Sequence, residues 1–389
     1  MQMTTIRCLV VMLVIATAAS GCSTSGTTSQ TSSPAAARSG ESPTPSAPTA
    51  KPTAPAAPGI FGVAVDGLVA GVPSRQYQVL IFDSNGTVVA RVGAATRAIQ
   101  TGTATLPETS QSATRAYFLD GDVTVRYLMP DGGTAVAGKI PSPGAGWTPD
   151  LQAAFAVSPD DKRIAIAMVG QDGSHLFVQD LNGDNRVGLY DGPIVEWPVG
   201  WHQQQLVLQV GDLRVPGYGS QGEYHVVNAA TGNRLSTVCE TGLVYGVPTM
   251  AGTLCSKGKS PTKGLFRLAW DATGPAVVGS CGNVENFGAA LRGDGNQWAT
   301  SLCGSGFGYE VNGHYVNGPD WGGGQVPYGT LVLPEGWMGG HCLVYGDGTS
   351  IGLIDVGPRD TDPNPFFCPQ VPRIGDHSIF VGTVPTQLQ

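Results

Sequence analysis

A short unit of two apolar strands joined by a tight turn recurs seven times along this chain. The turns lie 39 to 51 residues apart and centre on Gly86, Gly132, Gly183, Gly232, Gly274, Gly313 and Pro358. Apolar and polar residues alternate within the units, and no segment between them has a helical period. A repeat of this length built from alternating strands is typical of the blades of a β-propeller. The sequence therefore predicts an all-β, seven-bladed β-propeller, with six or eight blades as alternatives.

The first blade has too few strands for a complete propeller blade. Three strands are predicted there, at about 60–66, 77–83 and 87–92, and none of them suits the innermost position. The last apolar run, 377–384 (HSIFVGTV), alternates well enough to supply the missing strand. Because this pairing leaves no free edge at the junction of the two ends, we expect the C-terminal strand to close the ring.

One hairpin resembles a known kind of propeller blade. Residues 153–169 read AAFAVSPDDKRIAIAMV, in which Pro and Asp form the corner between two apolar strands. This resembles the Ser-Pro-Asp-Gly-Lys turn of TolB-like and WD-repeat-like blades, with Asp161 in place of glycine. The turns at 228–232 (NAATG) and 271–274 (DATG) resemble outer hairpins of TolB-like and quinoprotein-like blades. The resemblance covers most of residues 60–385 and implies the fold, but no particular activity.

The N-terminus has the features of an export signal. Arg7 precedes an apolar run at 8–18, which is shorter than the about 20 residues that a membrane-spanning helix needs. Residues 19–22 (ASGC) resemble the lipobox of bacterial lipoproteins, although the usual Leu is Ala19 here. The resemblance implies that residues 1–21 are removed and that Cys22 carries the lipid, including palmitate. An ordinary signal peptide cleaved nearby is the alternative.

The segment 22–58 is composed almost entirely of Ser, Thr, Ala, Pro and Gly. Its only charges are Arg38, Glu41 and Lys51. Such a segment cannot bury enough apolar surface to fold, so we predict a disordered tether that leads to a propeller domain at 59–389. The composition resembles that of lipoproteins from high-GC bacteria such as actinobacteria. The expected location is the extracytoplasmic face of the cell membrane, where the lipid is the membrane contact.

The charge of the chain argues against one class of partner. Only 13% of the residues are charged, the net charge is −8, and Lys and Arg do not cluster. Nucleic-acid binding depends on a basic surface that neutralises phosphates. The sequence therefore predicts no nucleic-acid partner.

Six cysteines lie in the repeat region, and in an exported domain they favour disulfides. Cys239 and Cys281 each follow a turn glycine by seven residues, at the end of an outer strand. Cys255 and Cys303 each fall in the second strand of the next blade. We therefore predict that two bonds join successive blades and that a third bond uses the remaining pair: Cys239–Cys255, Cys281–Cys303 and Cys342–Cys368. A metal site is the alternative, but no C-x-x-C pair or Cys-His spacing supports it.

No catalytic arrangement stands out in the sequence. There is no G-x-S-x-G motif, and the histidines are scattered over the repeat: His175, His202, His225, His314, His341 and His377. Some of them could point into a central channel, where propeller enzymes place metal ligands or acid–base groups. The sequence predicts no catalytic residue, no metal and no cofactor, and an enzyme remains the less favoured alternative.

Two short motifs have chemical meanings that we do not favour. Asp180, Asn182, Asp184 and Asp191 match EF-hand positions 1, 3, 5 and 12, but position 6 lacks the required Gly. A hairpin turn rich in Asx residues is the better interpretation. The tripeptide at 292–294 (RGD) matches an integrin-binding motif, and we interpret it as a chance match in an inner turn.

Tryptophan recurs about once per blade, and most copies are expected between blades. Trp321 and Trp337 lie among glycines, in segments that we interpret as loops, and are predicted to form an exposed binding surface. The sequence thus favours a non-catalytic binding or scaffolding module that contacts protein or cell-envelope polymer. An extracytoplasmic hydrolase, lyase or quinoprotein-like enzyme with its site in the central channel is the alternative.

Overall fold

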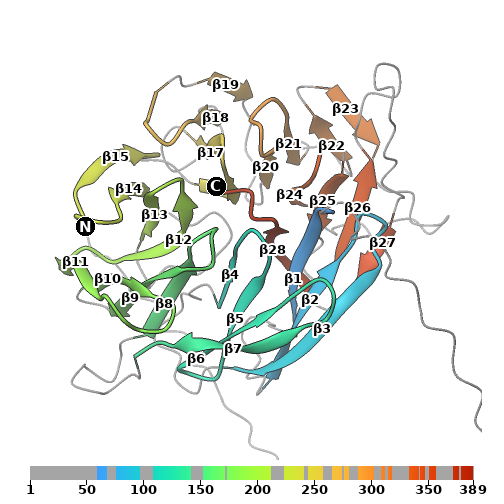
Figure 1. Ribbon diagram of the computed structural model, residues 1–389. Helices are drawn as coiled ribbons and strands as arrows, with labels where there is room; N and C mark the ends of the chain where they lie inside the picture. The colour runs from blue at the N-terminus through green and yellow to red at the C-terminus, as the bar shows by residue number, and fades with distance from the viewer. Residues whose placement is uncertain are drawn as a thin grey trace, which may run out of the picture. The chain divides into compact units, whose positions relative to one another are not determined.

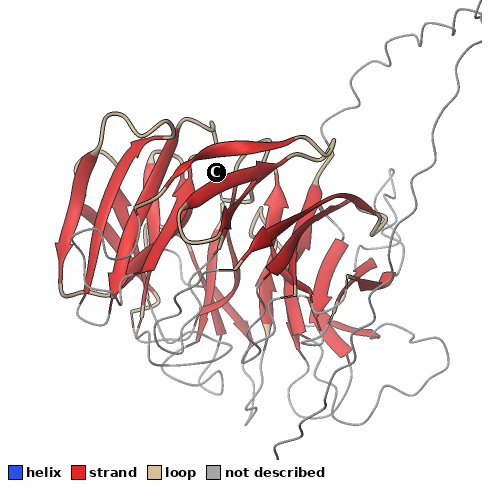
Figure 2. Cartoon of the chain, turned by 90° about the horizontal axis from the view of Figure 1, so that it is seen from below, coloured by secondary structure: helices blue, strands red, loops and turns tan. Residues whose placement is uncertain are grey.

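Antiparallel strands provide the regular structure in the part of the chain that the computed structural model describes, and no helix is found there (Figure 2). The described residues are 59–67, 76–96, 108–141, 152–170, 173–211, 223–240, 244–256, 265–273, 276–279, 288–301, 308–311, 314–317, 333–340, 342–346, 350–355, 371–375 and 378–388. All of them belong to one structural unit, Ala56–Gln389. The predicted signal peptide, Cys22 and the tether lie outside these residues.

In the described part of the chain, the strands form seven four-stranded antiparallel sheets, numbered here in chain order. Sheet 1 contains β28 (Ser378–Val384), β1 (Phe61–Asp66), β2 (Gln76–Phe82) and β3 (Val88–Ala95). Sheet 2 contains β4 (Thr109–Gln111), β5 (Ala116–Asp120), β6 (Thr124–Leu128) and β7 (Thr134–Lys139). Sheet 3 contains β8 (Gln152–Val157), β9 (Arg163–Gly170), β10 (Gly173–Asp180) and β11 (Val187–Gly192). Sheet 4 contains β12 (Glu196–His202), β13 (Gln205–Val210), β14 (Tyr224–Asn228) and β15 (Arg234–Val238).

The last three sheets have the same strand order. Sheet 5 contains β16 (Val244–Thr249), β17 (Gly252–Ser256), β18 (Leu265–Leu268) and β19 (Ala276–Gly279). Sheet 6 contains β20 (Ala289–Leu291), β21 (Trp298–Ser301), β22 (Gly308–Val311) and β23 (His314–Asn317). Sheet 7 contains β24 (Leu333–Met338), β25 (Cys342–Gly346), β26 (Ile351–Asp355) and β27 (Val371–Ile374). The prediction of an all-β propeller is confirmed.

The sheets are arranged around a common centre (Figure 1). The first strands of neighbouring sheets contact one another, from β24 through β28, β4 and β8 to β12, and from β16 through β20 to β24. Sheets 4 and 5 contact each other through the aromatic side chains of Tyr224 and Trp270, whose ring centroids are 5.5 Å apart. β4, β8, β12, β16, β20, β24 and β28 are therefore the inner strands of the ring.

The C-terminal strand closes the first sheet, as the sequence predicted. β28 pairs with β1 in antiparallel register, with Phe61 opposite Val384 and Asp66 opposite Ser378. Because the two strands come from opposite ends of the described unit, this pairing joins the ends of the ring.

A sheet that packs against another sheet on each of its two faces has inner strands whose side chains are buried on both faces. β8 is buried at every position, and β9 is buried at all but its first residue. The outer strand β3, in contrast, alternates between exposed and less exposed residues. The burial pattern explains why inner segments of the sequence read as continuous apolar runs.

Two tryptophans occupy equivalent places in the ring and fasten neighbouring inner strands. The indole Nε1 of Trp201 on β12 donates to the carbonyl oxygen of Ala156 on β8, at 3.0 Å. The Nε1 of Trp337 on β24 donates in the same way to Ala290 on β20, at 3.2 Å. Each indole is thus buried between two sheets with its one donor satisfied.

Glycines in the inner strands permit close packing near the centre. A Cβ at Gly336 would lie 2.2 Å from Cε1 of Phe380, which belongs to the next inner strand, β28. A Cβ at Gly200 would lie 2.4 Å from Cδ2 of Leu388. Each of these glycines directly precedes one of the two tryptophans that link neighbouring inner strands. Gly-Trp is therefore a repeated structural unit, which the spacing of the turns did not predict.

The outer strands carry a bulge at a recurrent position. In sheet 1, Phe82 pairs with Val88 and Ile81 pairs with Ala90, which leaves Val89 as the extra residue. Sheets 2, 3, 4 and 5 have the same irregularity between their third and fourth strands, and the extra residues there are Ala137, Leu189, Leu235 and Val278. A bulge of this kind bends the strand and increases its twist.

Candidate functional site

The turns between the first and second strands of the sheets lie on one side of the ring. A depression of ≈ 440 Å³ opens on this side, and we call it the axial mouth. Its lining comes from sheets 1, 5, 6 and 7 and comprises Ile60, Met250, Arg292, Gly293, Asp294, Gly339, Gly340, Thr383, Pro385, Thr386 and Gln387. Ile60 and Met250 are 44% and 51% exposed, so aliphatic surface faces solvent at its edge.

The segment that follows β28 forms one wall of the axial mouth and crosses the ring (Figure 1). The amide of Thr386 donates to the carbonyl oxygen of Ser112 in sheet 2, at 2.9 Å. The carbonyl oxygen of Gln387 accepts from the amide of Met250 in sheet 5, at 2.6 Å. Residues 385–388, which we call the C-terminal segment, therefore connect sheets that are far apart in the ring.

Neighbouring turns on this side are linked by side chains. Asp161 in sheet 3 accepts hydrogen bonds from Thr114 Oγ1 and Tyr117 Oη in sheet 2, at 2.7 and 2.9 Å. Arg163 donates to Gln204 in sheet 4, at 2.7 Å. Burial is the largest cause that raises the pKa of the Tyr117 hydroxyl above its ordinary value. The hydroxyl therefore remains a neutral donor to Asp161 over the physiological pH range.

Asp161 also explains the departure from the Ser-Pro-Asp-Gly-Lys turn. Its φ is +60°, in the left-handed region where glycine is favoured and where Asp is tolerated better than most residues. The carboxylate contributes the two contacts to sheet 2 that glycine could not make. The substitution thus retains the turn conformation and adds a link between sheets.

Arg292 and Asp294 form the only charged pair in the described lining of the axial mouth. The guanidinium Nε donates to Asp294 Oδ1 at 2.7 Å, and Nη1 donates to the carbonyl oxygen of Gly340 in sheet 7 at 2.8 Å. The hydrogen bond from Arg292 holds the pKa of the Asp294 carboxyl below its usual value. Arg292 and Asp294 of the RGD tripeptide are therefore bound to each other.

The described lining of the axial mouth combines exposed aliphatic side chains, glycines, two threonines and one ion pair. Its described lining contains no His, Cys, Ser or Tyr, and its single carboxylate is occupied by Arg292. Elsewhere in the described ranges, no three His, Cys, Asp or Glu side chains gather so that they could hold a metal ion.

A second polar cluster lies inside sheet 4. The ring nitrogens of His225 on β14 lie 2.9 Å from Glu196 Oε2 and 2.7 Å from Glu223 Oε1. The side chains of His225 and Glu196 are 2% and 4% exposed, and that of Glu223 is 24% exposed. Both imidazole nitrogens are engaged by carboxylates, so the ring has no free nitrogen to act on a substrate. The arrangement connects β12 and β14 across β13.

The other described histidines do not converge with His225. His175 Nδ1 pairs with Asp191 Oδ1 at 2.8 Å on sheet 3, and His202 lies 6.5 Å from Trp270, measured between ring centroids. His314 belongs to β23. His341 and His377 lie outside the described residues.

The EF-hand-like segment forms the hairpin turn between β10 and β11, in agreement with the interpretation of the sequence as an Asx-rich turn. Asp184 N donates to Asn182 Oδ1 at 3.1 Å, and Asn185 Nδ2 donates to Asp180 Oδ2 at 2.6 Å. Asp191, at the position that would close an ion-binding loop, instead lies on β11 opposite His175. The oxygens of this segment are therefore used within the hairpin.

The prediction that Trp337 forms part of an exposed binding surface is wrong. Trp337 is 0% exposed and packs with Leu343 and Tyr345 between sheets 6 and 7. The neighbouring glycine, Gly336, is part of an inner strand, where it allows close packing of Phe380. Trp321, the other member of the predicted surface, lies outside the described residues.

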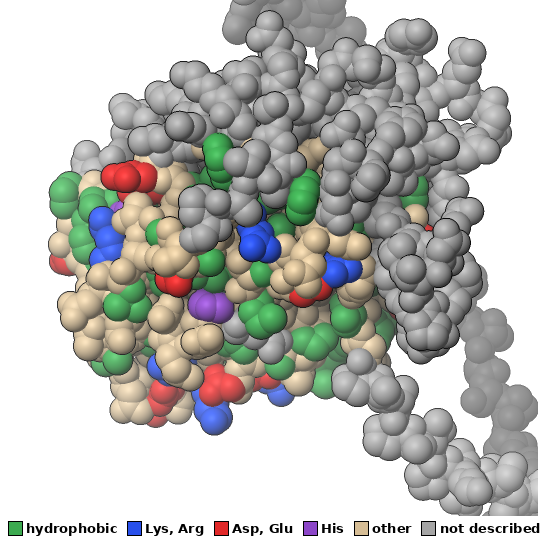
Figure 3. Space-filling model, turned by 90° about the horizontal axis from the view of Figure 1, so that it is seen from above, with side chains coloured by type: hydrophobic (Ala, Val, Ile, Leu, Met, Phe, Trp, Pro, Cys, Tyr) green, Lys and Arg blue, Asp and Glu red, His purple; other side chains and the backbone are tan. Residues whose placement is uncertain are grey.

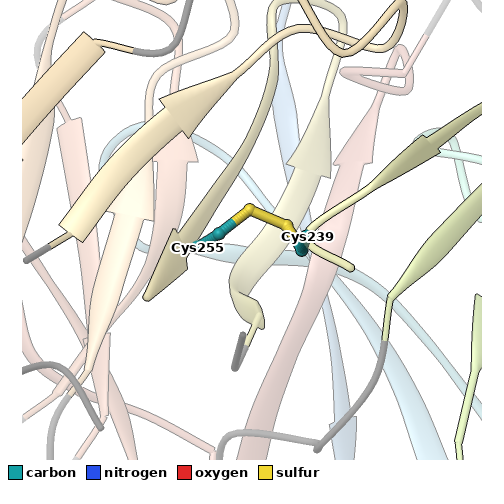
Figure 4. The surroundings of a disulfide bond; sticks show 2 residues. All are labelled: Cys239 and Cys255. Carbon is teal, nitrogen blue, oxygen red and sulfur yellow. A yellow bond between two sulfur atoms is a disulfide. The ribbon is translucent and has the colours of Figure 1, made fainter. Parts of the chain in front are cut away.

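A disulfide joins Cys239, directly after the outer strand of sheet 4, to Cys255 on the second strand of sheet 5 (Figure 4). Their Cα atoms are 5.6 Å apart. This is the pair of successive sheets that the spacing of the repeat predicted. Cys342 on β25 is also disulfide-bonded. Cys281, Cys303 and Cys368 lie outside the described residues, so the other two pairings stay predictions.

The surface seen in Figure 3 mixes side chains of all kinds. Lys and Arg are interspersed with Asp, Glu and hydrophobic side chains over the part that is not grey. No membrane-spanning helix occurs in the described ranges, since they contain strands, turns and loops alone.

The fold defines this chain as a protein of the β-propeller class. Its sequence matches no protein-family model and no curated protein. Among solved structures it is similar to TolB from Acinetobacter baumannii, at 11% identity and a TM-score of 0.40, over 66% of this chain and 62% of that chain. The match thus spans about three fifths of the TolB chain.

Two further solved propellers show a similar degree of likeness. The C-terminal WD40 domain of Sif2 matches at 11% identity and a TM-score of 0.39, over 65% of this chain and 70% of that chain. An oligogalacturonate lyase in complex with manganese matches at 8% identity and a TM-score of 0.39, over 62% and 70%.

Proposed function

We propose that this chain is a membrane-anchored extracytoplasmic lipoprotein whose β-propeller is a non-catalytic binding module. The lipobox-like sequence at Cys22 and the Pro-rich tether support the anchoring. We also propose that each four-stranded sheet is one blade, which gives a seven-bladed propeller. The binding surface in this proposal is the axial mouth.

The observation that carries the proposal is the chemistry of the axial mouth. Acid–base or nucleophilic catalysis needs a titratable or nucleophilic side chain aimed at the substrate. In the described lining, the one carboxylate, Asp294, is held by Arg292. Thr383 Oγ1 donates to the carbonyl oxygen of Pro385, and Thr386 Oγ1 accepts from the amide of Leu388. The rest of the lining is made of exposed aliphatic side chains, at Ile60 and Met250, glycines and main-chain groups. Such a surface favours recognition by shape, apolar contact and main-chain hydrogen bonds.

An extended protein segment is the partner that fits this chemistry best. The C-terminal segment already crosses the ring as an extended chain, through main-chain contacts at Thr386 and Gln387. A cell-envelope polymer rich in acidic or phosphate groups would need cations, and Arg292, the one cation among the described lining residues, is bound to Asp294. We therefore place protein ahead of polymer.

The cluster at His225 is the one observation that favours an enzyme. A His oriented by a buried carboxylate such as Glu196 is common in acid–base catalysis. Here, Glu223 occupies the other nitrogen, at the distance where a substrate or nucleophile would have to bind. The geometry supports a structural role for the cluster within sheet 4.

Two substitutions at equally exposed aliphatic residues test the proposal. Met250, at the axial mouth, and Leu235, at an outer bulge, are both 51% exposed. The detergent-solubilised protein and its Met250→Asp and Leu235→Asp variants would each be used to capture cross-linked envelope proteins and to probe a glycan array. We expect captured protein that is lost with Met250→Asp and kept with Leu235→Asp.

Three results would oppose this proposal. Glycan binding that depends on Met250 would replace protein with polymer as the partner class. Capture that is insensitive to Met250→Asp would move the binding surface away from the axial mouth. Turnover of an ester, peptide or glycoside substrate that is lost in His225→Gln would establish the enzymatic alternative.

A further inference from the structure

The C-terminal segment crosses the ring from one side to the other. It follows β28 in sheet 1, and its contacts reach sheets 2, 4, 5 and 7. Sheets 4 and 5 are each at least three sheets away from sheet 1 in either direction around the ring. A segment that joins them to sheet 1 must pass over the central axis.

The far end of the segment is anchored by an aliphatic side chain. Leu388 is 4% exposed and packs with Val199 and Val207 of sheet 4. Gly200 leaves the space that this side chain fills, because a Cβ there would lie 2.4 Å from Leu388 Cδ2. The pocket for Leu388 is thus built by the ring.

The remaining contacts are made by uncharged groups. The amide of Thr386 donates to Ser112 O at 2.9 Å, and the carbonyl oxygen of Gln387 accepts from Met250 N at 2.6 Å. The side-chain amide of Gln387 donates to the carbonyl oxygen of Trp337. Main-chain hydrogen bonds combined with a side-chain pocket are the way in which proteins bind extended peptides.

We infer that the axial mouth is a peptide-binding site and that the C-terminal segment is its ligand in cis. The segment competes with an extended, uncharged peptide that carries an aliphatic side chain in the Leu388 pocket. Pro385, Thr386 and Gln387 form a wall of the ≈ 440 Å³ depression. When the segment leaves, this wall is removed, and the depression becomes continuous with the Leu388 pocket.

The inference deepens the proposed function, since it names the partner class and a competitor for the same surface. The test uses a labelled synthetic peptide with the sequence of residues 383–389 (TVPTQLQ). Its binding would be measured by fluorescence anisotropy on the full chain and on a variant that lacks residues 385–389. We expect saturable binding to the truncated variant that is at least about tenfold tighter than to the full chain.

A matched peptide and a matched substitution provide the controls. The peptide with Leu388→Asp should bind the truncated variant at least about tenfold more weakly, because a carboxylate cannot enter an apolar pocket without a partner. Gly200→Ala in the truncated variant should also weaken binding, since the added Cβ occupies the pocket. Equal affinity of both peptides, or of the truncated and full chains, would overturn the inference.

Hydrogen exchange in the full-length protein tests whether the C-terminal segment can be displaced, even if the truncated variant does not fold. Gly200→Ala should displace Leu388 and speed exchange at the amide of Thr386 at least about tenfold. The amide of Ala113, which donates to Pro159 O at 3.0 Å, should keep its protection and serves as the internal reference. Unchanged exchange at Thr386 would show a permanent structural element and would refute displacement. The Met250-dependent capture described above could still succeed in that case, so the two failures are distinguishable.

Discussion

Leu388 fills the space left by Gly200, although the strand that leads to Leu388 belongs to a sheet on the other side of the ring. The contact is therefore a measure of how firmly the C-terminal segment is held. Leu388→Ala should lower the free energy of unfolding by about 2–5 kcal/mol, the usual range for a buried leucine. Leu235→Ala, at a 51% exposed position, should change it by less than about 0.5 kcal/mol. Urea unfolding of both variants measures the difference, and equal effects would contradict it.

Asp161 should be sensitive to the shape of its replacement. Asp161→Ala removes both acceptors of Thr114 and Tyr117 and places a Cβ without polar compensation at φ +60°. We expect a loss of about 1–3 kcal/mol in the free energy of unfolding. Asp161→Asn keeps an acceptor oxygen and tolerates the left-handed conformation, so its loss should be smaller. Thermal unfolding compares the two, and an Asn variant as unstable as the Ala variant would count against the link.

The Arg292–Asp294 pair predicts a small dependence of stability on acid. Because the folded-state pKa of Asp294 is lowered by Arg292, its contribution is present above the unfolded pKa of about 3.9. It is lost as the pH falls through the folded-state pKa. The pair is partly exposed, so the contribution should be well under about 1 kcal/mol. The difference in the free energy of unfolding between the protein and Asp294→Asn should shrink as the pH falls below the unfolded pKa and through the folded-state pKa, and a difference that does not change with acid would refute this.

The disulfide between sheets 4 and 5 closes a loop of 16 residues. Replacing both Cys239 and Cys255 by Ser should lower the free energy of unfolding by about 3 kcal/mol, the value expected for a loop of this length. The double variant is preferred to a reductant because Cys342 is also disulfide-bonded. Peptide mapping without reduction should in addition recover Cys281–Cys303 and Cys342–Cys368. A peptide that joins Cys342 to Cys281 or Cys303 would refute the predicted pattern.

The lipid anchor can be tested apart from the propeller. Cys22→Ser should abolish incorporation of a palmitate analogue and move the protein from the detergent phase to the aqueous phase of Triton X-114. The free energy of unfolding of the propeller should not change, because the tether is predicted to be disordered. Continued labelling of Cys22→Ser would show that the lipobox was misidentified.

The alternation of apolar residues and the positions of turn glycines were enough to predict the closing strand and one disulfide. The alternation in 377–384 and the missing strand of the first sheet were enough to predict the pairing of β28 with β1. The count of seven residues from a turn glycine placed Cys239 at the end of an outer strand, and hence next to Cys255. Turn positions and strand periods are visible within a few residues of sequence, so these inferences needed little long-range information.

The missed features arise from contacts between distant segments. The glycines at 339 and 340 favour a loop around Trp337, but Trp337 lies on the inner strand β24. The glycine before it, Gly336, is required there by the close approach of Phe380. The contact of Leu388 with Gly200 has no local pattern at all. Glu196 and His225 gave only a weak signal, as isolated polar residues within apolar strands.

The recurrent bulges of the outer strands have a consequence for contacts between neighbouring molecules of this protein. The fourth strand of a sheet is its outer edge, and a regular edge strand would offer a straight row of amides and carbonyls to another strand. The bulges at Val89 and Leu235 interrupt such a row. The bulges thus make the outer edges poorer templates for pairing between sheets of two molecules. Deleting Val89 or Leu235 would remove the bulge and leave a straighter edge for another strand to pair with.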